Sequence, residues 1–206
     1  MVMPRPNELH FNQMMMHTEI LSTQHRILCL SGALGQDMGP CDCLMGMASV
    51  SQEPIKLFIS SPGGMVTSLL TLYDTVRTLG VPVYTVGRYC ASAAAVLLAA
   101  GEKRYLYPHA KIMLHLISGV TEGGLELIQS QTKELKRDMD VLVDLLHECG
   151  VKHTASRILK DIRVEKWMSA QEAIDYGLAD EILTKETMRE WLGRNDTGDV
   201  AQMLRD

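Results

Sequence analysis

The fold is decided by residues 82–101, which read PVYTVGRYCASAAAVLLAAG. Residues 82–87 have the β-branched and aromatic character of a strand, whereas residues 93–101 form an unbroken small and apolar run typical of a buried helix. Ser92 stands between them, at a helix N-terminus where backbone N–H groups lack partners and negative charge is favoured. Serine is also a frequent helix N-cap, so this window alone favours a cap over a catalytic hydroxyl.

The composition is that of an ordinary globular protein. The chain has 206 residues, of which 46% are hydrophobic and 22% charged, and its net charge is −5. This length suits a single α/β domain with a sizeable core. Acidic and basic residues are interspersed and aromatic residues make up 5%, so neither nucleic acid nor a membrane surface is an expected partner. Signal-peptide and membrane-span patterns are absent, which predicts a cytoplasmic protein.

The five cysteines also indicate a reducing compartment, because their odd number and irregular spacing do not form a disulfide framework. Cys41 and Cys43 have no second Cys or His pair at metal-binding spacing, and we expect them in a buried helix turn.

Strand and helix patterns alternate along the chain. Strands are expected at 26–30, 55–59 and 83–86, and helices at 40–51, 65–79 and after Ser92. Such alternation predicts βαβ crossovers and a largely parallel sheet. Further short elements are expected, as strands at 105–107, 112–114 and 179–183 and helices at 154–160 and 169–176, the last with a capping box at Ser169.

A long amphipathic helix is expected between residues 124 and 150. Apolar side chains recur there at helical spacing, at Leu125, Ile128, Leu135, Met139, Leu142, Leu145 and Leu146. The segment is too long to lie flat on a small sheet, so we expect it to project and pack on another subunit. We assign residues 1–20 to an N-terminal arm, 21–184 to one domain and 185–206 to a polar tail.

Three further features suit a catalytic role for Ser92. The turn at residues 61–64, SPGG, follows a strand and lets backbone N–H groups approach a substrate, although a tight turn alone would also explain it. His115 ends an apolar strand and suits a general base, although a lone histidine is more often structural. An acid to orient its imidazole could be Asp161, Glu165, Asp175 or Asp180, and spacing does not choose among these four.

Several segments in this order resemble the ClpP family, the proteolytic subunits of Clp proteases, which are serine peptidases of the ClpP/crotonase fold. The matching segments are 59–64 (ISSPGG), 91–101 (ASAAAVLLAAG), 111–115 (KIMLH) and 168–180 (MSAQEAIDYGLAD). The resemblance covers about residues 20–184 and favours a nucleophile over a cap. It implies a spiral of βαβ units with the long helix projecting as a handle.

The resemblance also implies the roles of individual residues. Ser92 matches the nucleophile and His115 the general base, and the backbone N–H groups of Gly63 and Ala93 match the oxyanion hole. Glu165 stands where the family usually has an aspartate. Substrate is expected as an added strand between residues 64–66 and residues 116–119. The binding residues expected in these segments are Gly64, Met65, Val66, Leu116 and Ile117. Val164 replaces a family arginine associated with ring contacts, and Leu116–Ile117 replaces Gln-Pro.

The implied assembly is a barrel of two stacked heptameric rings, built as a homo- or hetero-oligomer. An AAA+ unfoldase would feed it unfolded proteins; because this chain has no nucleotide motif, we expect no cofactor here and ATP use by that partner. Three alternatives stay open: a weakly active or non-proteolytic structural subunit of a mixed ring, a crotonase-like acyl-CoA enzyme, and a phage-type maturation peptidase. The Ser92–His115 pair argues against the first two.

Overall fold

The computed structural model describes residues 21–119 and 122–193. Within them, six strands form one sheet in the order β1-β2-β3-β4-β5, and β6 pairs with β4. All neighbouring strands are parallel except β4 and β5, which are antiparallel. The strands are β1 (Ile27–Ser31), β2 (Ile55–Ser61), β3 (Val83–Ala91), β4 (Lys103–Leu114), β5 (Lys166–Ser169) and β6 (Glu181–Ile182). The mixed α/β architecture with a predominantly parallel sheet agrees with the expected fold class.

Helices connect the parallel strands, as the alternation of patterns predicts. They are α2 (Gly39–Val50), α3 (Val66–Thr78), α4 (Ala93–Ala99), α5 (Leu125–Glu148), α6 (Ala155–Asp161), α7 (Ala170–Tyr176) and α8 (Lys185–Trp191). Every residue of α4 is buried, and this small-residue helix packs in the main core with α2, α3 and the inward side chains of β2. Four of its seven residues are alanines, whose small side chains let these neighbours approach closely, so the element after Ser92 is held rigidly.

The strand before Ser92 is longer than expected and contains an irregularity. It runs to Ala91, and its register with β2 shifts because Arg88 has no partner between Gly87 and Tyr89. Such bulges bend a strand and redirect the residues that follow. The bulge therefore bends the last residues of β3, and with them Ser92, away from the direction that the strand has before Gly87.

The two short strands expected at 105–107 and 112–114 are one strand, β4. Its first half pairs with β6 and its second half with β5. Pro108 lies in the stretch that has no partner on β3, between Leu106 and Lys111, so its missing N–H costs no ladder bond.

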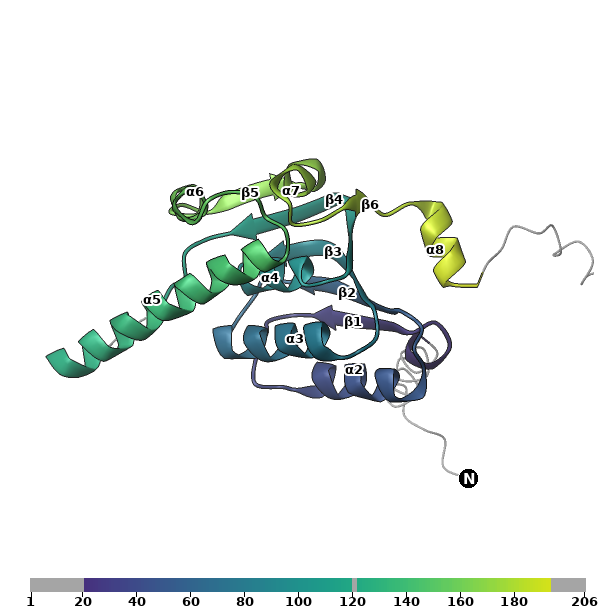
Figure 1. Ribbon diagram of the computed structural model, residues 1–206, viewed down its shortest axis with the longest axis horizontal. Coiled ribbons are helices and arrows are strands. Elements are labelled where there is room, and N and C mark those ends of the chain that lie inside the picture. The colour runs from purple at the N-terminus through teal and green to yellow at the C-terminus, as the bar shows by residue number, and fades with distance from the viewer. Residues whose placement is uncertain (1–20, 120–121, 194–206) are drawn as a thin grey trace, which may run out of the picture.

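The long helix α5 extends past the edge of the sheet (Figure 1). Its buried residues, Leu142, Val143, Leu145 and Leu146, all lie in the last two turns. Leu125 and Leu127 near its start are 71% and 51% exposed. Leu125, the first residue of the apolar stripe, is thus exposed within the described chain, and so is Leu127 on a different face of the helix.

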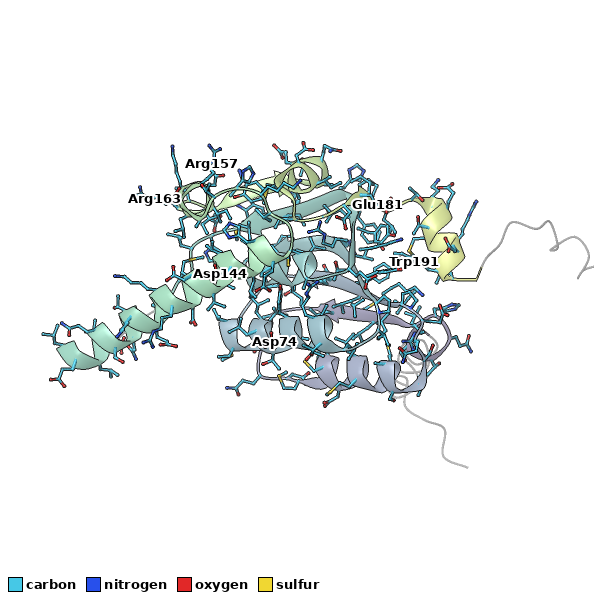
Figure 2. The ribbon with its side chains drawn as sticks, in the orientation of Figure 1. Asp74, Asp144, Arg157, Arg163, Glu181 and Trp191 are labelled. Carbon is cyan, nitrogen blue, oxygen red and sulfur yellow. The ribbon has the colours of Figure 1, made fainter. Side chains whose placement is uncertain are left out.

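Two local expectations need correction. Only Cys41 of the Cys41–Cys43 pair is buried; Cys43 is exposed, because residues two apart on a helix point to different faces. A polar tail was expected after residue 184, yet helix α8 lies there and carries Trp191, which is labelled in Figure 2. The ring of Trp191 packs edge-on against Tyr105 of β4. Residues 1–20, assigned to an arm, lie outside the described residues.

The capping box at the start of α7 is confirmed. Ser169 Oγ accepts the Glu172 N–H at 3.4 Å, and Glu172 Oε2 accepts the Ser169 N–H at 2.8 Å. Within the described ranges, no helix has the length and apolar character needed to cross a membrane.

Candidate active site

Ser92 stands at the N-cap position of α4, but its side chain does not cap the helix. Its backbone has φ 56° and ψ −127°, an unusual conformation for a residue with a Cβ. The Ser92 N–H donates to Met113 O at 2.8 Å, which ties this turn to β4. Strained backbone that is held by its surroundings is frequent at functional sites, and here it directs the hydroxyl away from the helix.

The Ser92 hydroxyl is hydrogen-bonded to His115. The Ser92 Oγ–His115 Nε2 distance is 2.7 Å, and both side chains are partly buried. His115 directly follows the last residue of β4, and β3, which leads into Ser92, is the neighbouring strand. Adjacent parallel strands therefore bring the two residues together at one edge of the sheet, within the distance that proton transfer requires.

The nearby thiol does not compete for the role of nucleophile. Cys90 is fully buried, and burial raises the pKa of its thiol to about 12. A thiol that stays protonated and enclosed is unreactive, because the thiolate is the nucleophilic form.

Three of the four candidate acids are engaged elsewhere. Asp161 is paired with Arg157 at 2.9 Å, and the hydrogen bond from that guanidinium is the main cause that lowers the pKa of the carboxyl. Asp175 accepts a hydrogen bond from Gln171 at 2.9 Å, and Asp180 forms an ion pair with Arg104. None of these three lines the cleft that contains Ser92.

The ends of two paired strands bring Glu165 and His115 to one part of the sheet. Antiparallel β4 and β5 pair Met113 with Trp167 and Leu114 with Lys166, and His115 and Glu165 are the residues that adjoin this last pair. The segments stay side by side beyond the strands, although in a shifted register, because the Leu116 N–H donates to Ile162 O at 3.1 Å. Residues two apart on a strand share a face, so Glu165 leaves the face of Trp167 and His115 that of Met113, and these two faces are the same.

The Glu165 carboxylate nevertheless has a different partner in this structure. Its Oε2 accepts a hydrogen bond from Trp167 Nε1 at 2.9 Å, and no hydrogen bond joins it to His115 within the described chain. Glu165 lines the same cleft as Ser92 and His115.

Gly63 and Ala93 lie beside the Ser92 side chain. A Cβ on Gly63 would come within 2.8 Å of Ser92 Cβ and 3.0 Å of Ala93 N. Ala93 is the first residue of α4, where the N–H has no acceptor inside the helix. The Gly63 N–H donates to Ser61 Oγ at 3.1 Å, so it is engaged by a neutral hydroxyl in this state.

The backbone at Gly64 offers one free side to a ligand. The Leu34 N–H donates to Gly63 O at 2.8 Å and the Met65 N–H to Leu34 O at 2.9 Å. In extended chain, alternate residues direct their polar groups to opposite sides, so the N–H and C=O of Gly64 face away from Leu34. A Cβ at Gly64 would meet Leu34 O at 2.1 Å, so only glycine allows this approach.

A cleft of about 480 Å³ lies beside these groups, although Gly63 is not among the residues that line it. Ser92, His115 and Glu165 line it, as do Ala93 and the expected binding residues Gly64, Met65, Val66 and Ile117. Leu116 does not line it and packs against the core instead. The remaining wall is largely apolar and includes Val96, Leu135, Met139, Leu142, Leu146 and Ile162.

Gly63→Ala should lower kcat/KM for a fluorogenic peptide by on the order of 10²-fold. The added Cβ would lie 2.6 Å from Ala91 O, and the φ of +92° disfavours any side chain, so the turn must move away from Ser92. Gly46→Ala is the matched control, since its Cβ meets nothing within 4 Å, and it should keep full activity. Full activity of Gly63→Ala would show that this turn does not need its present position.

Sequence reasoning named Ser92 and His115, which the structure brings together, but missed two neighbours of the site. Trp167 donates to Glu165, and Ser61 accepts from Gly63. The Trp167 contact had a signal in the sequence, because residues two apart on a strand share a face. Among the described residues, no group of three or more His, Cys, Asp or Glu side chains is arranged to hold a metal ion.

Comparison with known proteins gives one consistent answer. The Clp protease family model matches residues 13–186. The chain is 40% identical over 144 residues to the ATP-dependent Clp protease proteolytic subunit 1 of Chlamydia felis, covering 67% of this chain and 69% of that protein. It is 39% identical over 152 residues to subunit 2 of Chlamydia pneumoniae, covering 70% and 73%. The chain belongs to the Clp protease family.

Proposed function

We propose that this chain is a serine endopeptidase subunit in which Ser92 is the nucleophile, His115 the general base and Glu165 the acid. The observation that carries the proposal is the 2.7 Å hydrogen bond between Ser92 Oγ and His115 Nε2, made inside a cleft at a helix N-terminus. A side chain that only capped the helix would bond to its backbone, which Ser92 does not do.

The chemistry is acyl transfer to the Ser92 hydroxyl. His115 Nε2 takes the hydroxyl proton as Oγ attacks the peptide carbonyl, and returns it to the leaving amine. Water then attacks the acyl-enzyme. His115 takes a proton from this water and returns it to Ser92 Oγ, which releases the second product. Glu165 accepts the Nδ1–H of His115, which fixes the tautomer and stabilises the imidazolium.

The N–H groups of Ala93 and Gly63 stabilise the tetrahedral oxyanion. The Ala93 N–H has no acceptor within its helix, and the dipole of α4 favours negative charge at this end. The Gly63 N–H exchanges its bond to Ser61 Oγ for one to the oxyanion, because a charged oxygen is a stronger acceptor than a hydroxyl.

Substrate binds as an extended strand beside Gly64. The N–H and C=O of this residue are directed away from Leu34, which supports backbone pairing with a peptide on that side. Ile117 also lines the cleft, and Leu116 contributes through the core rather than by contact.

The cleft wall predicts a preference for apolar side chains before the scissile bond. Its walls from α4 and α5 are aliphatic, and Glu165 is the acidic group in it, so an acidic substrate side chain would be both desolvated and repelled. Peptides with Leu or Met at that position should have kcat/KM at least about tenfold above those with Asp. Equal rates, or a preference for Asp, would contradict this account of the cleft.

We propose that the chain assembles into two stacked heptameric rings through α5. Two leucines at the start of this helix, Leu125 and Leu127, are largely exposed in the described chain, and burying them against a second copy removes apolar surface from water. Native mass spectrometry should find a particle of fourteen chains. A monomer that persists at micromolar concentration would contradict the assembly.

An AAA+ unfoldase is the proposed source of unfolded polypeptide, and ATP is used there rather than by this chain. The name "ATP-dependent Clp protease proteolytic subunit" carried by the relatives supports this division of labour. No cofactor enters the proposed chemistry.

The five cysteines are free, which supports a cytoplasmic location. The protease names also favour an active subunit over a purely structural one.

A further inference from the structure

We propose that Trp167 is a positioning residue for the catalytic acid: its indole N–H holds one oxygen of Glu165 so that the other faces His115. This inference rests on the proposed function of Glu165. Nothing in the comparisons assigns a role to Trp167.

The hydrogen bond follows from the geometry of β5. Glu165 immediately precedes the strand and Trp167 lies two residues later, so both side chains leave the same face. Trp167 Nε1 donates to Glu165 Oε2 at 2.9 Å. Trp167 is paired with Met113 of β4, and His115 lies two residues after Met113, so the same face also presents His115.

The indole is itself held in place. Its ring packs against Tyr89, with ring centroids 6.3 Å apart, and Tyr89 lies on β3 shortly before Ser92. The tryptophan is 48% exposed, so burial contributes only part of its placement and the contact with Tyr89 adds to it. Trp167 thereby connects the strand that carries the acid with the strand that leads to the nucleophile.

The hydrogen bond from Trp167 addresses a problem that a glutamate creates at position 165. Glutamate has one more rotatable bond than aspartate, and an exposed carboxylate samples several rotamers. Fixing Oε2 removes most of this freedom and leaves Oε1 for the Nδ1–H of His115. A carboxylate has lone pairs on both oxygens, so it can accept from the indole and the imidazole together.

A purely structural role for Trp167 predicts something different. If the side chain mattered only for packing on Tyr89, its replacement by phenylalanine would be nearly silent, and any loss would be independent of Glu165. If the indole N–H positions Glu165, replacing Trp167 lowers kcat, and the same replacement has no effect in a protein whose Glu165 carboxylate has been removed.

The test is a double-mutant cycle on peptide hydrolysis. Trp167→Phe, which keeps an aromatic ring on Tyr89 and removes the N–H, should lower kcat about tenfold and leave KM within twofold. In a Glu165→Ala background the same substitution should change kcat by less than twofold. Trp191→Phe is the matched control, because this second tryptophan lies on α8, at the end of the molecule away from α5 (Figure 2), and it should keep full kcat.

Thermal unfolding of each variant separates folding from positioning, and Trp167→Leu, which also lacks a hydrogen-bond donor, serves if the phenylalanine variant does not fold. An unchanged kcat in Trp167→Phe, or an equal loss in both backgrounds, overturns the inference while the proposed function stands. If Ser92→Ala hydrolyses the peptide at the unmodified rate, the proposed function fails, and this inference fails with it.

Discussion

Ser92→Ala lowers kcat/KM for a fluorogenic peptide by at least about 10⁴-fold, the largest effect expected of any single substitution in this chain. The residue supplies the atom that becomes acylated, and its Oγ is the hydrogen-bond partner of His115 Nε2. Removing the hydroxyl leaves only the oxyanion donors and the binding surface, which accelerate attack by water far less than a nucleophile does.

The fold should tolerate this change. The Ser92 side chain makes no capping bond, and alanine occupies the next three positions of the chain. Ser49→Ala is the matched control: Ser49 is an exposed residue of α2 whose hydroxyl donates to Gly46 O, and its loss should leave activity unchanged. Activity of Ser92→Ala within tenfold of the unmodified protein would contradict the assignment of the nucleophile.

Glu165→Gln lowers kcat on the order of 10³-fold, the second largest expected effect. Glutamine keeps the size of the side chain and can still accept from Trp167, but its neutral amide does not stabilise the imidazolium, and its NH₂ group favours the wrong tautomer of His115. Peptide hydrolysis with separate kcat and KM measures the effect, which should lie in kcat.

Asp161→Asn is the control that distinguishes the two acids on the same stretch of chain. Its carboxylate is paired with Arg157, which Figure 2 places on α6, so the asparagine variant should hydrolyse peptide within twofold of the unmodified protein. Near-full activity of Glu165→Gln together with a large loss in Asp161→Asn would assign the acid to Asp161 instead.

The sequence predicted the central part of the fold because local patterns and tertiary context agree there. Residues 82–101 have strand character followed by helix character, and the structure contains β3 and α4 at these positions. The turn at Gly63 and Gly64 follows β2, as a glycine pair after an apolar strand indicates. Parallel order of β1 to β4 then follows from the helices between them.

The parts that the sequence missed depend on contacts between distant segments. Strand β5 has four residues and no clear alternation, and it exists because β4 offers an edge to pair with. Its pairing with β4 is what brings Glu165 to the end of the strand that His115 follows, and spacing along the chain carries no information about such pairing. For this reason the four candidate acids could be separated by resemblance or by structure, but not by pattern.

Helix α8, near the C-terminus, was also missed by the sequence analysis because it depends on contacts with distant strands. Residues 185–191 are mostly polar, and none of them is fully buried. Trp191 packs in an aromatic group whose other members, Phe58, Tyr84 and Tyr105, come from three different strands. A single tryptophan in a polar segment gives no periodic signal, although it anchors the helix on the sheet.

Covalent labelling by a fluorophosphonate, read by intact mass and peptide mapping, tests the nucleophile most directly. The unmodified protein should gain one adduct per chain, mapped to Ser92, and Ser92→Ala should gain none. Labelling that continues unchanged in Ser92→Ala, or an adduct that maps to another residue, would contradict the account.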